Sequence, residues 1–138
     1  MKADSSVYVL DSFALLAYLQ REAGGAQVEA VLEQAVRGAA RVVMCIINYG
    51  EALYILERES DMREIQRTIA AVDALPVTMI DVGRDLVFAA AHIKANFALA
   101  YADAFAIALA QREHATILTG DPEFERVREL INIEWMER

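Results

Sequence analysis

The sequence predicts a single α/β domain in which helices cover both faces of a parallel sheet. Three observations support this prediction. Short apolar runs of strand length alternate along the chain with longer segments whose apolar residues recur at helical spacing. The loops between these segments are short. No linker, internal repeat or low-complexity segment divides the 138 residues. Strands and helices that alternate over short loops build a layered sandwich around a parallel sheet.

Five segments are expected to be strands of this sheet. The first, Val7–Leu10, is a short continuous apolar run, which is typical of a strand buried on both faces. The others are Arg41–Cys45, Val77–Ile80, Thr116–Thr119 and Ile131–Ile133. Parallel strands all point the same way, so residues that directly follow them are expected at one edge of the sheet.

The segments between the strands are expected to be helical, and glycine, proline and polar residues mark their ends. Ser12 is expected to cap the first helix, and Gly24 and Gly25 separate it from the second. Pro76 stops the fourth helix because proline cannot continue it. The expected helices run from Phe13 to about Arg21, from beyond Gly25 to near Gly38, over Ile46–Glu59, over Met62–Leu75, from Val82 to about Asn96, and from Asp103 through Ala110, with a short helical turn after Pro122.

Composition is that of a folded globular domain. Hydrophobic residues make up 57% of the chain against 25% charged residues, which argues against disorder. No apolar run reaches the ~20 residues that span a bilayer, and the N-terminal run is too short for a signal peptide. Cys45 has no partner for a disulfide and is expected in the core. We therefore expect a cytoplasmic domain that does not bind a membrane.

The chain is acidic, with a formal net charge of −8. A charge of this sign argues against a large surface that binds nucleic acid without specificity. It does not exclude a nuclease, because clustered carboxylates that bind a metal contribute to the same total.

Two aspartates stand where neither a helix nor a strand pattern favours a charge. Asp103 begins a helix that is otherwise apolar, and Ile107 and Ala110 share its face. An ionised carboxylate on an apolar face is costly unless a cation or hydrogen-bond donors meet it. Asp121 follows the expected strand Thr116–Thr119 with one glycine between, which places it at the sheet edge where sites are built.

Two further acids extend this group. Asp11 directly follows the first expected strand, so it is expected at the same edge as Asp121. Glu51 lies on a largely apolar stripe of the helix that follows the second strand. Ser12 and Thr119 add hydroxyl groups close to the same edge.

Each acid also has an ordinary structural interpretation. Asp11 can be a helix cap, Asp121 a turn residue before proline, and Glu51 a solvated or paired side chain. All four acids together favour a site. Hard divalent cations take oxygen ligands, and two-metal sites use carboxylates to hold ions about 4 Å apart. The group therefore predicts a metal site at the carboxyl edge of the sheet.

Other chemistries fit the sequence less well. His92 lies in a helical pattern and His114 precedes a strand, and no cysteine or histidine has the spacing of a zinc site. The chain contains no glycine-rich phosphate loop and no recognisable nucleophile elbow. A phosphatase with Asp11 as nucleophile would need a second aspartate two residues on, where Phe13 stands.

Four segments, in order, resemble those of PIN-domain ribonucleases, and specifically of the VapC-type toxins of toxin–antitoxin pairs. No single segment is specific, but four in this order at these spacings are a strong signal. The segments are VYVLDSFALLAYL, INYGEALYIL, AYADAFAIALA and ILTGDPEF. By this resemblance the four acids of the family are Asp11, Glu51, Asp103 and Asp121.

Three smaller features bear on the same resemblance. Asn48 stands in the usual place before the second acid, and Thr119 matches the hydroxyl residue two positions before the last acid. Phe13 departs from the family, which often has a small polar residue there. The hydroxyl of the neighbouring Ser12 is retained, so the departure bears on fine geometry or substrate choice.

The resemblance implies a PIN-like three-layer sandwich over residues 1–138, with a parallel sheet of four or five strands. It implies a metal-dependent endoribonuclease that uses Mg²⁺ or Mn²⁺, with RNA as substrate, a homodimer and a cognate antitoxin. Two alternatives stay open: an RNA-processing nuclease outside a toxin system, and a non-catalytic PIN-like interaction module. The four intact acids favour an enzyme, because a scaffold gains nothing from uncompensated charges on apolar faces.

Two helices also indicate partner chains. The segments Ile46–Glu59 and Val82–Asn96 are apolar over most of their surface, which is normal only for buried helices. Both can simply pack on the sheet. The alternative is that surplus apolar surface is covered by a second copy of the chain or by an antitoxin segment.

Overall fold

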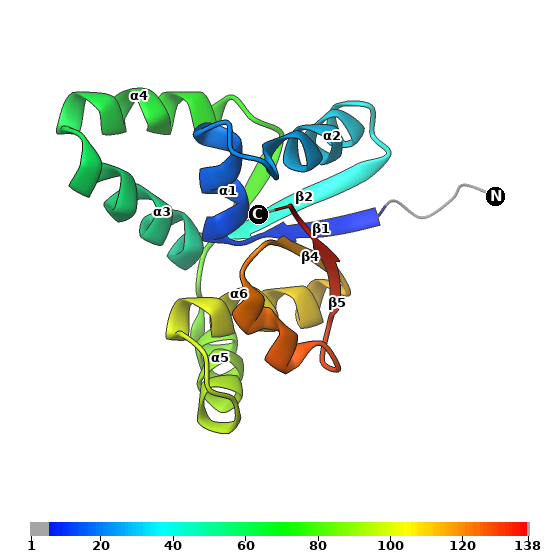
Figure 1. Cartoon of the computed structure of the whole chain (residues 1–138). Helices are drawn as coiled ribbons and strands as arrows, with labels where there is room; N and C mark the ends of the chain where they lie inside the picture. Colours follow the sequence, from blue (N-terminus) through cyan, green and yellow to red (C-terminus); the bar gives the residue numbers. More distant parts are fainter. Residues whose placement is uncertain (1–5, 138) are drawn as a thin grey trace.

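The computed structural model describes residues 6–137 and contains a five-stranded parallel sheet between two layers of helices (Figure 1). The strand order is β3-β2-β1-β4-β5, so β1 is central. This confirms the predicted single-domain α/β sandwich, although residues 1–5 and 138 of the expected 1–138 domain lie outside the described residues. The strands are β1 (Ser6–Leu10), β2 (Ala40–Cys45), β3 (Val77–Ile80), β4 (Thr116–Thr119) and β5 (Asn132–Trp135).

The helices divide between the two faces of the sheet. Figure 1 shows α1 to α4 on one side of the sheet and α5 and α6 on the other. The six α-helices of residues 6–137 occur as the pairs α1–α2, α3–α4 and α5–α6, and each pair connects one strand to the next along the chain. The helices are α1 (Ser12–Leu19), α2 (Gly25–Val36), α3 (Ile46–Glu59), α4 (Met62–Asp73), α5 (Arg84–Asn96) and α6 (Tyr101–Glu113), followed by the 3-10 helix η1 (Pro122–Val127).

Alternation of side chains along the central strands creates two cores. Val9 of β1 and Ile117 of β4 pack with α5 and α6, whereas their neighbours Leu10 and Leu118 pack with α1 and α2. Both faces of the sheet are therefore apolar, which explains why the central strands appear in the sequence as continuous apolar runs.

Helix α6 is buried on nearly every side. Its residues from Asp103 to Ala110 are all buried, and it contacts α5, α3 and the central strands. A helix that is apolar all round requires this position. No single helix among residues 6–137 has the length and hydropathy of a membrane span; α5 and α6 meet that test only as a pair bent by 119°.

The first helix begins one residue earlier than the sequence predicts, because Asp11 and not Ser12 is its cap. The Asp11 carboxylate accepts a hydrogen bond of 2.8 Å from the backbone N–H of Ala14. Ser12 is the first helical residue, and its hydroxyl is free to contact another element. The expected cap at Ser12 is therefore wrong, and the alternative structural interpretation of Asp11 as a helix cap is confirmed.

The remaining differences lie at element ends. Helix α6 begins at Tyr101, two residues before Asp103, and α5 begins at Arg84. The last strand is Asn132–Trp135, longer than the expected Ile131–Ile133. Periodicity locates the middle of an element better than its ends, which depend on individual capping contacts.

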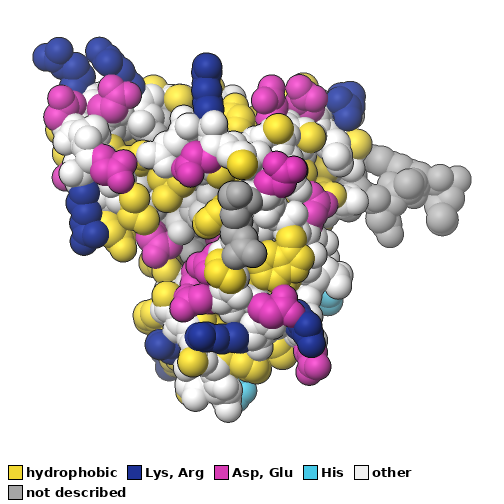
Figure 2. Space-filling model, in the orientation of Figure 1, with side chains coloured by type: hydrophobic (Ala, Val, Ile, Leu, Met, Phe, Trp, Pro, Cys, Tyr) yellow, Lys and Arg dark blue, Asp and Glu magenta, His cyan; other side chains and the backbone are white. Residues whose placement is uncertain are grey.

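Several large apolar side chains stay on the surface. They include Ile46, Ile47 and Tyr54 of α3, Phe88 of α5 and Tyr101 of α6. Figure 2 shows hydrophobic side chains exposed among acidic ones on the face that it presents. Helices α3 and α5 therefore do not bury all of their apolar surface against the sheet.

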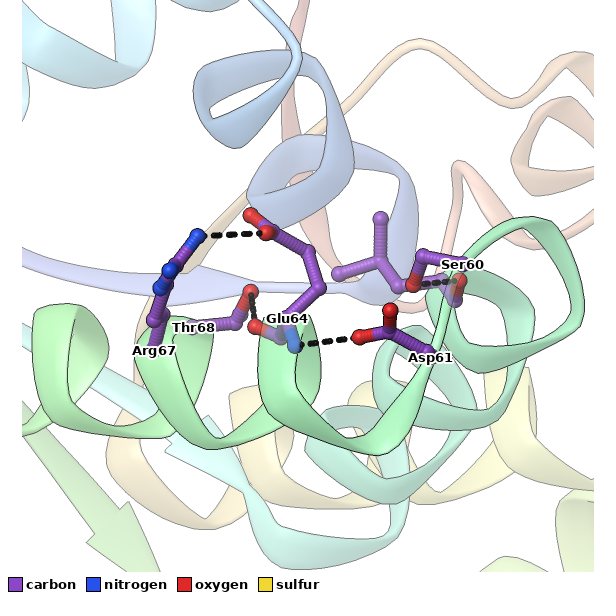
Figure 3. A network of polar contacts seen from close by, with 6 residues as sticks. Ser60, Asp61, Glu64, Arg67 and Thr68 are labelled. Atoms are coloured by element: carbon purple, nitrogen blue, oxygen red, sulfur yellow. Dashed lines mark hydrogen bonds and ion pairs between the residues drawn. The ribbon is translucent and has the colours of Figure 1, made fainter.

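A network of polar contacts forms the corner between α3 and α4 (Figure 3). Asp61 caps α4 by accepting a hydrogen bond of 2.9 Å from the backbone N–H of Glu64. At the end of α3, the Ser60 hydroxyl donates to the carbonyl of Leu56 at 2.8 Å. Arg67 pairs with the Glu64 side chain at 3.3 Å. These contacts satisfy backbone groups at both helix ends and hold the corner that orients α3.

Gly25 lets α1 and α2 approach closely. A Cβ atom at Gly25 would lie 2.8 Å from the carbonyl oxygen of Ala17, a backbone atom that cannot move alone. We expect Gly25→Ala to lower the free energy of unfolding by roughly 1–3 kcal/mol, because the two helices must shift apart. Urea denaturation followed by circular dichroism measures this change.

Gly50 provides the matched control. It lies inside α3, and a Cβ atom there would have no neighbour within 4 Å. Gly50→Ala should raise the free energy of unfolding by about 0.5–1 kcal/mol, because alanine loses less backbone entropy in a helix. Equal effects of the two substitutions would contradict the close contact between α1 and α2.

Candidate active site

The carboxyl ends of β1 and β4 bring two of the predicted acids together. These strands are parallel neighbours, with Leu10 opposite Leu118, and Asp11 and Asp121 follow them. Thr119, fully buried, links the two acids. Its hydroxyl donates to the Asp11 carboxylate at 2.5 Å and accepts from the backbone N–H of Asp121 at 3.0 Å. The predicted meeting of both acids at one edge is confirmed.

Asp103 reaches the same edge from the first turn of α6. It is 7% exposed, and its carboxylate accepts no hydrogen bond from the described residues. Asn48 of α3, fully buried, donates its amide N–H to the carbonyl of Ala102 at 2.9 Å, which ties α3 to the start of α6. Asn48 therefore fixes the helix turn that carries Asp103.

Glu51 lies beside the start of α1. The Ser12 hydroxyl donates to the Glu51 carboxylate at 2.5 Å and so joins α1 to α3. Glu51 is half-buried, and its charge acts on both Asp11 and Asp103. The four predicted acids thus surround one site, where Figure 2 shows acidic side chains near the meeting of α1, α3 and α6.

Glu123 is a site residue that the sequence reasoning missed. Ligand atoms of Asp103, Asp121 and Glu123 all lie within 4.8 Å of one another, whereas Asp11 and Glu51 stand outside this group. Asp121 caps η1 by accepting from the backbone N–H of Glu123, and the turn brings the two side chains to the same place. The available signal was the spacing of two acids around Pro122 directly after a buried strand.

Burial raises the pKa of two carboxyl groups in the site to about 7. For Asp11 the main cause is desolvation, opposed by the hydrogen bonds from Thr119 and Ala14. For Asp103 desolvation acts first, and the charge of Asp121 adds to it. Unlike Asp11, Asp103 accepts no hydrogen bond from Thr119 or from a helix N-terminus that would lower its pKa.

The charges in this group are not balanced by the protein. Among residues 6–137, the only salt bridge to one of the five acids is between Arg126 and Glu123, at 3.9 Å. Crowded oxygen ligands without a cation are the donor set that Mg²⁺ and Mn²⁺ prefer. The residues therefore fit a divalent metal ion.

The residues that sequence reasoning set aside lie elsewhere. His114 ends α6 in the left-handed conformation (φ 51°), and His92 is exposed on α5. Cys45 is buried in the core with α5 and α6, as predicted. Within the described part of the chain, the only group with metal-binding geometry is the acidic one.

Comparison with known proteins identifies a family and a fold. The family model of the PIN domain matches residues 8–130. Similar solved structures include VapBC2 from Rickettsia felis bound to a DNA fragment from their promoter (TM-score 0.73, 14% identity, 95% of this chain and 99% of that chain). DNA-bound VapBC from Salmonella typhimurium has TM-score 0.73 and 16% identity, over 94% of this chain and 97% of that chain.

A third similar structure is VapC20 of Mycobacterium tuberculosis, described as a sarcin–ricin loop cleaving toxin. Its TM-score is 0.65 and its identity 17%, over 88% of this chain and 95% of that chain. Identities this low establish a common fold only. Sequence comparison with curated proteins finds no match.

The raised pKa values predict how stability depends on pH and metal. The folded protein holds protons on Asp11 and Asp103 more tightly than the unfolded chain between pH 3.8 and about 7. The stability of metal-free protein should therefore fall as pH rises through this range. Each pKa unit is worth about 1.4 kcal/mol, or roughly 3–6 °C in Tm for a domain of this size. Thermal melts at pH 5 and 7.5 test this.

Addition of Mn²⁺ at pH 7.5 should raise the Tm, because the ion binds only the folded site. Asp103→Asn is the control. It removes one buried charge and no hydrogen bond, so the metal-free variant should be at least as stable as wild type, with a weaker pH dependence and a smaller Mn²⁺ shift. A large loss of stability in this variant would show that Asp103 is a structural hydrogen-bonding residue.

Proposed function

The chain belongs to the PIN domain family, and we propose that it is a metal-dependent endoribonuclease that serves as the toxin of a type II toxin–antitoxin pair. Asp103 carries the proposal. Asp103 is only 7% exposed, its carboxylate accepts no hydrogen bond from the described residues, and a carboxylate oxygen lies within 4.8 Å of ligand atoms of two other acids. Such a group is costly in a folded domain unless a cation binds it.

We assign the metal-binding role to Asp11, Glu51, Asp103 and Asp121, with Glu123 as an added ligand. A bound Mg²⁺ or Mn²⁺ would supply a Lewis acid that lowers the pKa of water and offsets charge at the scissile phosphate. The carboxylates would hold that ion, and the water it activates would attack the phosphorus while the 3′ oxygen leaves. Mg²⁺ in proteins usually keeps coordination positions for waters and substrate phosphates, so phosphate oxygens of the RNA would complete its coordination.

Two hydroxyl groups act as positioning groups in this scheme. Thr119 donates to Asp11 and so restrains the orientation of its carboxylate. Ser12 donates to Glu51, restrains the orientation of that carboxylate and holds α3 against α1. Thr119 is therefore expected to influence metal affinity through Asp11.

Similarity to VapBC structures supports the toxin assignment over the two alternatives. VapC20 is a toxin that cleaves the sarcin–ricin loop, which favours RNA as the substrate class. The VapBC structures contain a toxin together with its antitoxin, which favours an antitoxin partner here. An RNA-processing nuclease would share the chemistry without the partner. An interaction module would have no use for the buried charges.

The exposed apolar side chains support a homodimer and a bound antitoxin. Large apolar residues are exposed on α3, α5 and the start of α6, although a domain of this size rarely leaves such surface uncovered. We propose that a second copy covers part of this surface and that an antitoxin segment covers another part. The acidic site would accept an arginine from that segment, which would displace the metal and stop cleavage.

The nuclease assignment predicts cleavage of structured RNA that requires Mn²⁺ or Mg²⁺ and is abolished by EDTA. Asp103→Asn should reduce kcat/KM at least about 100-fold, because it removes a metal ligand. Glu123→Gln should reduce it by about tenfold or more. Initial cleavage rates on end-labelled RNA, with protein freed of any partner, give these values.

Glu129→Gln serves as the control for this series. Glu129 is exposed near the start of β5, at the opposite edge of the sheet, so the substitution removes one negative charge outside the site. Its cleavage rate should match that of wild type. If the wild-type protein cleaves no RNA under any metal condition, the interaction module is the better assignment.

The partner assignment predicts a dimer in solution that binds the product of an adjacent small open reading frame. Light scattering across a dilution series should give twice the chain mass, and addition of that product should inhibit cleavage. A strictly monomeric protein whose activity ignores the product would exclude the toxin role. It would leave the nuclease assignment intact.

A further inference from the structure

We propose that Phe13 and the concavity beside it bind one unstacked nucleobase next to the scissile phosphate, so that Phe13 determines specificity. This inference rests on the proposed RNA cleavage. It concerns the position at which the chain departs from the small polar residue expected there. The acids would then act on the phosphate, while Phe13 and its neighbours would act on the adjoining base.

The Phe13 ring lies directly against the loop that carries the acids. A Cβ atom at Gly120 would lie 2.3 Å from the ring, so the ring occupies the space that a side chain there would need. Gly120 stands between Thr119, which contacts Asp11, and Asp121. The half-buried ring therefore borders the acidic site and remains open to solvent on its other side.

A concavity of about 350 Å³ opens next to the ring. One wall is a face of α1, and the other walls are the loop between α1 and α2 and the C-terminal segment after β5. The lining residues that matter here are Phe13, Leu16, Gln20, Glu22 and Glu137. The lower part is apolar, and the side chains that can form hydrogen bonds stand at the rim.

The C-terminal wall is held in place before any ligand binds. Gln27 of α2 donates to the carbonyl of Trp135 at 3.1 Å and accepts from the backbone N–H of Glu137 at 2.9 Å. The backbone N–H of Met136 donates to the carbonyl of Thr119 at 2.8 Å. Gly24 packs so closely on Met136 that an added Cβ would lie 2.5 Å from its terminal methyl group. A preformed wall lowers the entropic cost of binding.

A nucleobase fits this concavity better than other parts of RNA. Glu22 and Glu137 at its rim repel a phosphate, whereas a neutral base meets no such penalty. Its flat face can stack on the Phe13 ring, which is the common mode for unpaired bases. Its exocyclic amino group can donate to Gln20 or to a rim carboxylate. Because the Phe13 ring lies against Gly120, the residue before Asp121, we expect the base that adjoins the scissile phosphate to reach it.

Single-stranded RNA oligonucleotides with one abasic site at each position in turn test the assignment. For wild type, one abasic position beside the cut should raise KM about tenfold and change kcat little. Phe13→Leu keeps an apolar side chain but removes the ring. Its KM for intact RNA should therefore be as high as that of wild type for the abasic RNA. The abasic site should not raise the KM of this variant further. Phe13→Trp should restore the wild-type pattern. An unchanged abasic penalty in Phe13→Leu would overturn the proposal.

Phe97→Leu is the matched control, because Phe97 is a second half-buried phenylalanine, at the end of α5, and does not line the concavity. It should keep the full abasic penalty. Thermal melts check that each variant folds. If Phe13→Leu leaves RNA cleavage unchanged and instead weakens binding of the antitoxin, the concavity is a protein site and the proposal fails.

Failure of the proposed nuclease can be told apart from failure of this inference. If wild type cleaves no RNA, oligonucleotides that carry 2-aminopurine report base stacking by fluorescence without cleavage. A fluorescence change that depends on Phe13 supports a nucleobase site in a protein without nuclease activity. The same response in wild type and in Phe13→Leu overturns the site.

Discussion

Burial of α6 from Asp103 to Ala110 is the constraint on which the candidate site depends. Apart from Asp103 this stretch is apolar on every side, so it packs between the sheet and α5, and this position brings the first turn of the helix to the ends of β1 and β4. Asp103 in that turn then lies beside the acids that follow these strands. The side-chain amide of Asn48 donates to the carbonyl of Ala102 and so holds the first turn of α6 in place. The hydrophobic core thus places a carboxylate where the protein supplies no counter-charge.

The polar groups of the candidate site lower the stability of the folded domain. Two carboxyl groups have pKa values raised to about 7, and the buried amide oxygen of Asn48 has no hydrogen-bond partner among the described residues. A domain selected for stability alone would replace these groups with apolar ones. Thr119 holds the carboxylate of Asp11 in place, and Ser12 holds that of Glu51, but neither hydroxyl neutralises a charge. The divalent cation proposed for this site would remove the conflict, because it would supply the missing positive charge.

The sequence was informative where periodicity and strand order decide the structure, and less so where single contacts decide it. Alternating apolar segments predicted the parallel sheet, and the position of Asp11 and Asp121 after strands predicted their meeting. Glu123 was missed because its place depends on the turn of η1, which periodicity does not describe. The sequence leaves both Asp11 and Ser12 open as the cap of α1, because two adjacent polar residues suit that role equally. Only the geometry shows that Asp11 accepts the N–H of Ala14.

Asp11 has two roles, and this affects how substitutions at the site are interpreted. One oxygen caps α1 through the N–H of Ala14, and the other accepts from Thr119. Its replacement by alanine would remove a helix cap, at about 1 kcal/mol, together with a candidate metal ligand. Lost activity would then have two causes. Asp103 makes neither contact, so its replacement by asparagine changes the charge of the site without removing a hydrogen bond. Metal dependence is therefore best assigned through Asp103, and Asp11 is best interpreted together with Thr119.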